Sequence, residues 1–122
     1  MRDEIMEVFF TNEFQTVHIK NLHFEYWGTV NKFNKPDGIG RMIFNENSIH
    51  EGAFKNGEPT GYGRRCDVNG TLFSGTYDQG IREGKGTFID INGKQRKGYW
   101  SHFKYDGPIG APAAATEGGV LG

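Results

Sequence analysis

The chain has 122 residues, which suits a single domain, and only 35% of them are apolar while 19 are glycine. Its 14 basic and 15 acidic residues nearly balance, so the chain lacks the overall positive charge that attracts nucleic acids or anionic membranes. The single cysteine excludes an internal disulfide and fits a reducing compartment, and no apolar run approaches the roughly 18 residues of a membrane-spanning helix.

Residues 1–10 are compatible with two structures. Asp3 could cap a short helix in this segment, whereas its last residues, Val8–Phe10, could equally form a strand. In either case we expect the segment to cover the first edge of the sheet that follows. Thr16–Lys20 alternates apolar and polar residues and predicts a strand. We therefore interpret residues 1–23 as a cap followed by a degenerate half repeat.

A 23-residue period organises residues 24–107. Glycine recurs at Gly52, Gly75 and Gly98, and an aromatic residue follows each of them two positions later. A fixed period of this length is the signature of a repeat architecture, in which each unit buries its apolar face by stacking on its neighbours. The last residues, 108–122, have no period and are rich in Gly, Ala and Pro, as in a linker or disordered tail.

Each unit predicts two strands. In the unit that begins at Ile49, a strand to Phe54 leads into a Gly-rich loop, Lys55–Gly61, and a second strand follows at Tyr62–Asp67. The dipeptide Asn-Gly at 56–57 recurs at 92–93 and predicts tight turns, because both residue types accept positive φ. The preceding unit starts with the strand Phe24–Val30 and is one residue longer, and we place the extra residue in the loop Asn31–Asp37.

Alternation along the strands assigns residues to faces. Phe54, Tyr77 and Trp100 share one face, and the in-strand glycines beside them make room for neighbouring rings. Cys66 aligns with Ile43 in the opposite column and is expected to be a small buried apolar residue. The glycines assigned a structural role are Gly28, Gly52, Gly75, Gly98, Gly38, Gly61 and Gly84.

The combined pattern resembles the MORN repeat. It is carried by Phe73-x-Gly75-x-Tyr77, Gly80, Gly84-x-Gly86 and Gly93, and it recurs in weaker form from residue 24 to residue 107. The resemblance implies an all-β fold, a single-layer twisted antiparallel sheet of stacked hairpins. It also implies a place among cytoskeletal, ciliary or membrane-skeleton assemblies, and hence a cytoplasmic, cytoskeletal or ciliary location, or the membrane periphery.

A one-layer sheet leaves one of its faces uncovered, so the aromatic face is expected to bind a partner. We therefore predict a non-enzymatic scaffold that docks partner proteins, or a second copy of itself, within a larger assembly. The predicted contact residues are Trp27, Phe54, Phe73, Tyr77 and Trp100.

Basic residues suggest an alternative. Their clusters could contact the anionic phospholipids of a membrane, an acidic protein surface, or only solvent at a strand edge. The residues concerned are Arg64, Arg65, Lys94, Arg96 and Lys97. A peripheral membrane tether is therefore the second predicted function.

No motif predicts catalytic, cofactor or metal-binding residues. The three Gly-x-Gly sequences lack the third glycine and the following helix of a dinucleotide site. The four histidines and the cysteine do not fall at metal-ligand spacing.

Overall fold

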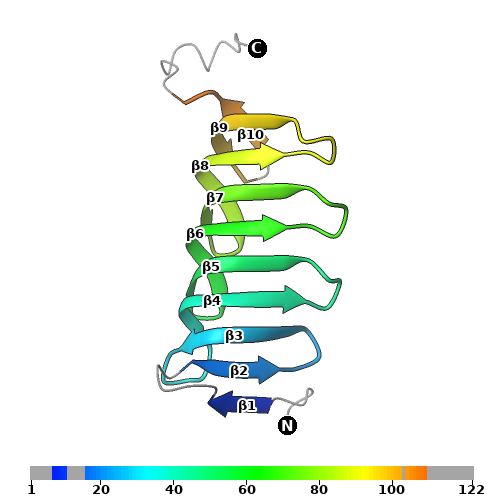
Figure 1. Ribbon diagram of the computed structural model, residues 1–122. Helices are drawn as coiled ribbons and strands as arrows, with labels where there is room; N and C mark the ends of the chain where they lie inside the picture. The colour runs from blue at the N-terminus through cyan, green and yellow to red at the C-terminus, as the bar shows by residue number, and fades with distance from the viewer. Residues whose placement is uncertain (1–6, 11–15, 103, 110–122) are drawn as a thin grey trace.

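A single antiparallel sheet of ten strands runs through the part of the chain that the computed structural model describes, residues 7–10, 16–102 and 104–109. Each strand pairs with the next one along the chain, so the hairpins stack in sequence order, with β1 and β10 at opposite ends (Figure 1). The strands are β1 (Glu7–Phe10), β2 (Val17–Lys20), β3 (Phe24–Val30), β4 (Pro36–Phe44), β5 (Ile49–Lys55), β6 (Glu58–Cys66), β7 (Leu72–Asp78), β8 (Ile81–Ile89), β9 (Gln95–Ser101) and β10 (Lys104–Gly107). The prediction of an all-β, single-layer repeat sheet is confirmed.

The first edge of the sheet is a strand. β1 pairs with β2 in antiparallel register from Glu7 to Phe10, which decides between the helix and the strand considered for this segment. Residues 1–6, and the predicted tail from residue 110 onward, lie outside the described residues.

The predicted Gly-rich loop is a two-residue turn. Asn56 and Gly57 have φ values of 51° and 97° and connect Lys55 directly to Glu58, which pair across the two strands. The expected loop Lys55–Gly61 is therefore too long, because β6 already begins at Glu58. This turn matches the twist of the strands, so hydrogen bonding continues up to it.

The second Asn-Gly dipeptide forms a different turn. Only Gly93 has a positive φ there, because a carboxylate oxygen of Asp90 accepts hydrogen bonds from the backbone N–H groups of Asn92 and Lys94, each at 2.9 Å. This side-chain cap stabilises a longer turn. Both dipeptides thus lie in turns, as predicted, but the two turns differ in length and in which residues have a positive φ.

The extra residue of the earlier unit lies where it was predicted. Val30 pairs with Pro36 across the β3–β4 turn, whereas Phe54 pairs with Pro59 across the equivalent β5–β6 turn. The first connection is thus one residue longer, and the strands on either side keep their alignment.

Each hairpin bends at a pair of glycines. Gly75 pairs with Gly86, and the register shifts immediately afterwards, between Gly75 and Tyr77. A Cβ atom on Gly75 would lie 2.6 Å from the Cα atom of Gly86, so the two backbones approach more closely than any side chain allows. Equivalent shifts follow Gly28 and Gly52. These bulges bend the sheet in every unit.

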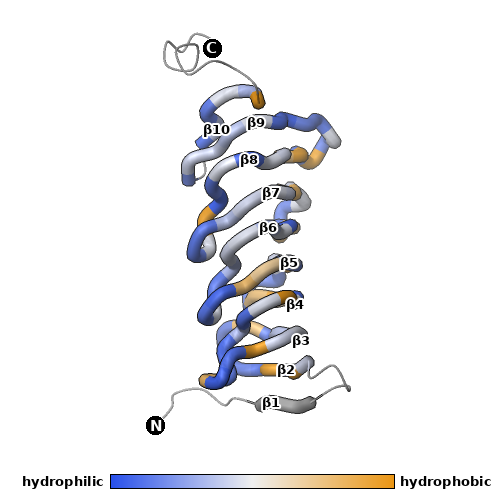
Figure 2. The backbone as a smooth tube through the Cα atoms, turned by 90° about the vertical axis from the view of Figure 1, so that its left-hand side faces the viewer, coloured by the Kyte–Doolittle hydropathy of each residue, from blue (hydrophilic) through white to orange (hydrophobic). Residues whose placement is uncertain are grey.

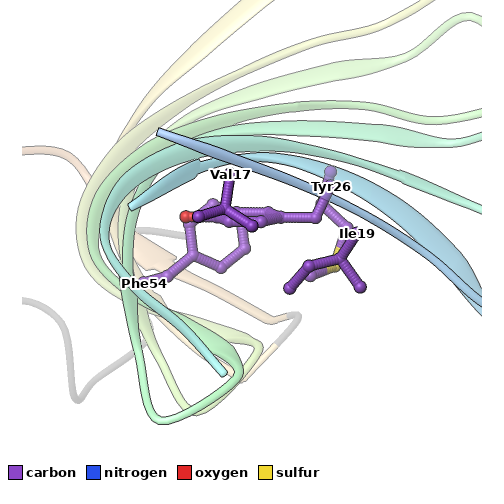
Figure 3. Packing of buried hydrophobic residues seen from close by; sticks show 5 residues of the cluster. Val17, Ile19, Tyr26 and Phe54 are labelled. Carbon is purple, nitrogen blue, oxygen red and sulfur yellow. The ribbon is translucent and has the colours of Figure 1, made fainter. Parts of the chain in front are cut away.

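The bends curl the sheet around its own core. The hairpins lie one above another along a single axis when the stack is turned by 90° (Figure 2). Seen from close by, the sheet curves around the side chains of Val17, Ile19, Tyr26 and Phe54 (Figure 3). A second buried cluster, Phe73, Tyr77 and Trp100, continues the core towards the last strands. One layer therefore encloses a core by curvature, where most domains use two layers.

Candidate functional site

Aromatic rings on the concave side form a column of edge-to-face contacts that crosses from unit to unit. Phe73 touches Tyr77 in its own unit and Trp100 in the next one, with ring centroids 5.6 and 5.3 Å apart. His50 makes the same pair of contacts with Phe54 and Tyr77. These perpendicular arrangements are the favourable ones for aromatic pairs, so the column both fills the core and links the units.

The column is closed to a partner over most of its length. Phe54 and Phe73 are 3% exposed, and Tyr77 and Trp100 are 5% and 6% exposed. The expectation that these four rings form an open docking face is therefore wrong. The curl of the sheet lets the rings cover one another, which a flat layer could not do.

Trp27 lies on the opposite, convex side of the sheet. It is half-buried and stacks on the imidazole of His18, with ring centroids 4.9 Å apart and planes inclined by 8°. Nε2 of His18 in turn lies 2.6 Å from a carboxylate oxygen of Glu25. Trp27 therefore belongs to a convex-side contact and does not extend the aromatic column.

The predicted basic residues do not share one surface. Arg64 points to the convex side, where Nη2 lies 3.4 Å from a carboxylate oxygen of Glu51. Its neighbour Arg65 points to the concave side, where Nε lies 3.3 Å from a carboxylate oxygen of Asp67. Successive strand residues face opposite sides, so a run of charges is divided. The division is as follows: Arg64 and Lys97 are convex, Arg65 and Arg96 are concave, and Lys94 lies in the β8–β9 turn.

A cleft opens on the concave side at the end of the array that carries β8, β9 and β10. Its volume is about 490 Å³. Its walls combine aromatic rings with three cations, Arg82, Lys94 and Arg96. The guanidinium of Arg96 lies 4.9 Å above the ring centroid of Tyr105. We call this feature the basic cleft, and its lining residues are Arg82, Phe88, Asp90, Lys94, Gln95, Arg96, Trp100 and Tyr105.

Arg82 is the cation of the cleft that was not predicted from the sequence. Its guanidinium carbon lies 4.9 Å from the ring centroid of Phe73, 5.5 Å from that of Phe88 and 5.3 Å from that of Trp100. Burial is the main cause of a lowered pKa for Arg82, but a guanidinium starts so far above neutrality that it stays charged. Contacts of this kind between cations and ring faces strengthen when water is partly excluded.

Comparison with protein families identifies the 23-residue repeat. The family model of the MORN repeat matches residues 50–72 and 73–95 as two consecutive units. Residues 50–95 are MORN repeats. Comparison with curated proteins finds no match.

The basic cleft arises where the chain departs from its own MORN pattern. At a period of 23, Arg82 stands where the earlier units have the buried residues Pro36 and Pro59. Arg96 stands where the preceding MORN unit has Phe73 at the first aromatic position. The replacement of proline by arginine at equivalent positions of the repeat is the signal that could have identified Arg82 from the sequence.

Cys66 is exposed, which corrects the expectation that it is buried. It pairs with Ile49 on one side and Leu72 on the other, and Leu72 pairs with Ile89. The predicted column of apolar residues therefore exists, but it lies on the convex side of the MORN array. Nothing in the described part of the chain covers Cys66 there, because the curl turns this face outwards.

Among the described residues, no group of three or more His, Cys, Asp or Glu side chains could hold a metal ion. The same residues include no helix that is long and apolar enough to cross a membrane.

Proposed function

We propose that this MORN-repeat chain is a non-enzymatic scaffold that docks a partner protein in its basic cleft. The observation that carries the proposal is the cleft at β8, β9 and β10. Its walls include the rings of Phe88 and Tyr105, which the fold itself covers only partly. A cleft of a few hundred Å³ with apolar walls and a few polar groups is typical of a binding site.

The setting of this scaffold rests on the MORN repeats. Such repeats occur in proteins of cytoskeletal and ciliary assemblies, and repeat arrays in general offer extended surfaces for partners. We therefore place the chain in an assembly of this kind. The partner is a different protein in this proposal, and a second copy of the chain is the competing occupant.

The membrane tether has less support from the geometry. A flat anionic surface gains roughly 1 kcal/mol from each basic residue near it, so several must face it together. Arg64 and Lys97 face one side of the sheet, while Arg65 and Arg96 face the other. Arg64 and Arg65 are also engaged by acidic neighbours, Glu51 and Asp67.

Site-specific photo-cross-linking tests the docking proposal. A benzophenone amino acid would replace Lys94, which lines the cleft, or Lys97, which lies on the convex side three residues later. In cells, we expect a protein adduct from position 94 and none from position 97. Equal adducts from both positions would place the contact elsewhere, and adducts to lipid alone would support the tether. An adduct with a second copy of the chain would show that the cleft mediates self-association and does not bind a different protein.

A further inference from the structure

The basic cleft has the chemistry to choose its partner by charge. Resting on the docking function proposed above, we propose that the cleft binds an acidic, extended segment of the partner, whose carboxylates meet Arg96 and Lys94 while its backbone and apolar side chains lie on the rings of Tyr105 and Phe88. The occupant is thus an Asp- or Glu-rich stretch of polypeptide.

The charge inventory of the cleft favours an anion. Its lining holds three cations, Arg82, Lys94 and Arg96, and one carboxylate, that of Asp90. One oxygen of that carboxylate already accepts two backbone hydrogen bonds in the β8–β9 turn. Among the described residues, no carboxylate lies within ion-pair distance of Arg96 or Lys94. A ligand with several negative charges would supply the missing partners.

The rest of the molecule shows that this arrangement is unusual for the chain. On the convex side, Arg41 and Arg64 both pair with Glu51, at 3.3 and 3.4 Å. On the concave side, Arg65 lies 3.3 Å from Asp67 and 3.9 Å from Glu46. These arginines are neutralised within the fold, whereas the guanidinium groups of Arg82 and Arg96 lie over aromatic rings. Arg96 differs from these arginines, because no carboxylate among the described residues lies within ion-pair distance of it.

The distribution of the cations favours a chain of carboxylates over one compact anion. Arg82 lies over the rings of Phe73, Phe88 and Trp100, whereas Arg96 lies over the separate ring of Tyr105, and Lys94 belongs to the turn. The three charges come from β8, the β8–β9 turn and β9. Neighbouring strands are about 4.8 Å apart, and an extended peptide advances about 3.3 Å per residue, so two or three successive residues span this width.

The position of the cleft favours a peptide over a membrane. Arg82 and Arg96 lie on the inner side of the curled sheet, above aromatic rings, and Lys94 belongs to the β8–β9 turn beside them. A polypeptide is thin enough to enter such a cleft, whereas a bilayer surface is broad and would first meet the rims. Aromatic walls next to cations also suit peptide groups, because rings pack on apolar atoms while guanidinium groups bind carboxylates.

The test uses a fluorescein-labelled octaglutamate and its octaglutamine analogue, with binding measured by fluorescence anisotropy in about 0.1 M salt, where charges still interact over roughly 10 Å. Arg96→Glu is compared with Lys97→Glu, because the two neighbours face opposite sides of the same strand and undergo the same charge change. We expect Arg96→Glu to weaken octaglutamate binding about tenfold or more and Lys97→Glu to change it less than about twofold. Octaglutamine should bind at least about tenfold more weakly than octaglutamate.

The other outcomes overturn the inference. If Arg96→Glu and Lys97→Glu weaken octaglutamate binding equally, the peptide is attracted by the overall charge of the protein and not by a specific site. If octaglutamate does not bind but phosphatidylserine vesicles bind in a way that depends on Arg96, the ligand of the cleft is a lipid headgroup and not a peptide. If octaglutamate does not bind but the adduct at position 94 forms in cells, the cleft docks a partner protein, and the proposal that this partner is acidic is wrong. Circular dichroism of both variants checks that the sheet is intact.

Discussion

The imidazole of His50 meets the ring of Tyr77 edge-on, with ring centroids 4.5 Å apart and planes inclined by 84°. This contact joins consecutive units at the centre of the aromatic column, in a position where His50 is fully buried. Neither ring nitrogen of His50 has a hydrogen-bond partner. The histidine thus packs as an aromatic ring. Its two nitrogens lose their hydrogen bonds to water on folding and gain none in the protein, which destabilises the folded state.

Replacing His50 with Phe should stabilise the protein. The substitution keeps an aromatic ring and removes two buried, unpaired nitrogens, which predicts a gain of about 1–3 kcal/mol in the free energy of unfolding. Phe73 occupies the equivalent place over Gly86 in the next unit, so a phenyl ring fits this environment. Urea unfolding of His50→Phe and wild type measures the difference. A loss of stability would mean that a water or a polar partner satisfies the imidazole.

The same histidine should make stability depend on pH. Burial first, and then the charge of Arg65, lower the pKa of His50 to about 4. The unfolded chain, with a histidine pKa of about 6.5, therefore binds more protons than the folded one between these two values. Stability should fall as pH decreases from about 6.5 to about 4, by about 3 kcal/mol in total, and this contribution should level off below that. His50→Phe should lack this component, and unfolding series at several pH values compare the two proteins.

Gly75→Val should prevent the array from forming. Even a Cβ atom at this position would lie 2.5 Å from the carbonyl oxygen of Lys85 and 2.6 Å from the Cα atom of Gly86. Backbone atoms cannot move aside as a side chain can, so we expect a cost of at least about 3 kcal/mol. The control is Gly93→Asn, in an open turn with φ at 87°, a conformation that Asn tolerates. Melting temperatures decide the matter, and an unchanged value for Gly75→Val would refute the steric explanation.

Trp100→Ala should weaken one end of the stack more than the other. The indole packs against Phe73 and Tyr105 and donates a hydrogen bond from Nε1 to the backbone oxygen of Gly86, at 3.3 Å. Removing it should cost about 3 kcal/mol. Because units of a repeat array contact only their neighbours, hydrogen exchange should accelerate in β8–β10 and change little in β2–β4. Uniform acceleration would instead indicate that the whole sheet unfolds as one cooperative unit.

Cys66 should react with a thiol reagent in the folded protein. Its side chain is exposed on the convex side, between Ile49 and Leu72. Labelling by Ellman's reagent should therefore proceed at a rate within about tenfold of that in denaturant, since access and thiolate content control the reaction. Labelling that requires unfolding would show that this face is covered, for example by a second copy. Dilution of the protein would then restore the reaction.

The sequence by itself determined the repeat, its 23-residue period, the strands and the alternation of faces. These features are local: glycine at a close approach, Asn-Gly at a turn and aromatic residues two positions beyond a glycine each act through neighbours along the chain. Even the extra residue before Pro36 could be located, because an insertion in a turn leaves the strands aligned.

Only the tertiary structure decided what the two faces of the sheet do. Each hairpin bends at a glycine pair, as at Gly75 and Gly86, and stacking places these bends one above another, so that the sheet curves around a shared core. Curvature buries Phe54 and Trp100, which alternation alone left open, and exposes Cys66, which alternation placed in an apolar column. It also brings Arg82 above rings from three different strands. Burial depends on which distant segments enclose a residue, so local patterns assign a face while curvature decides whether that face meets water.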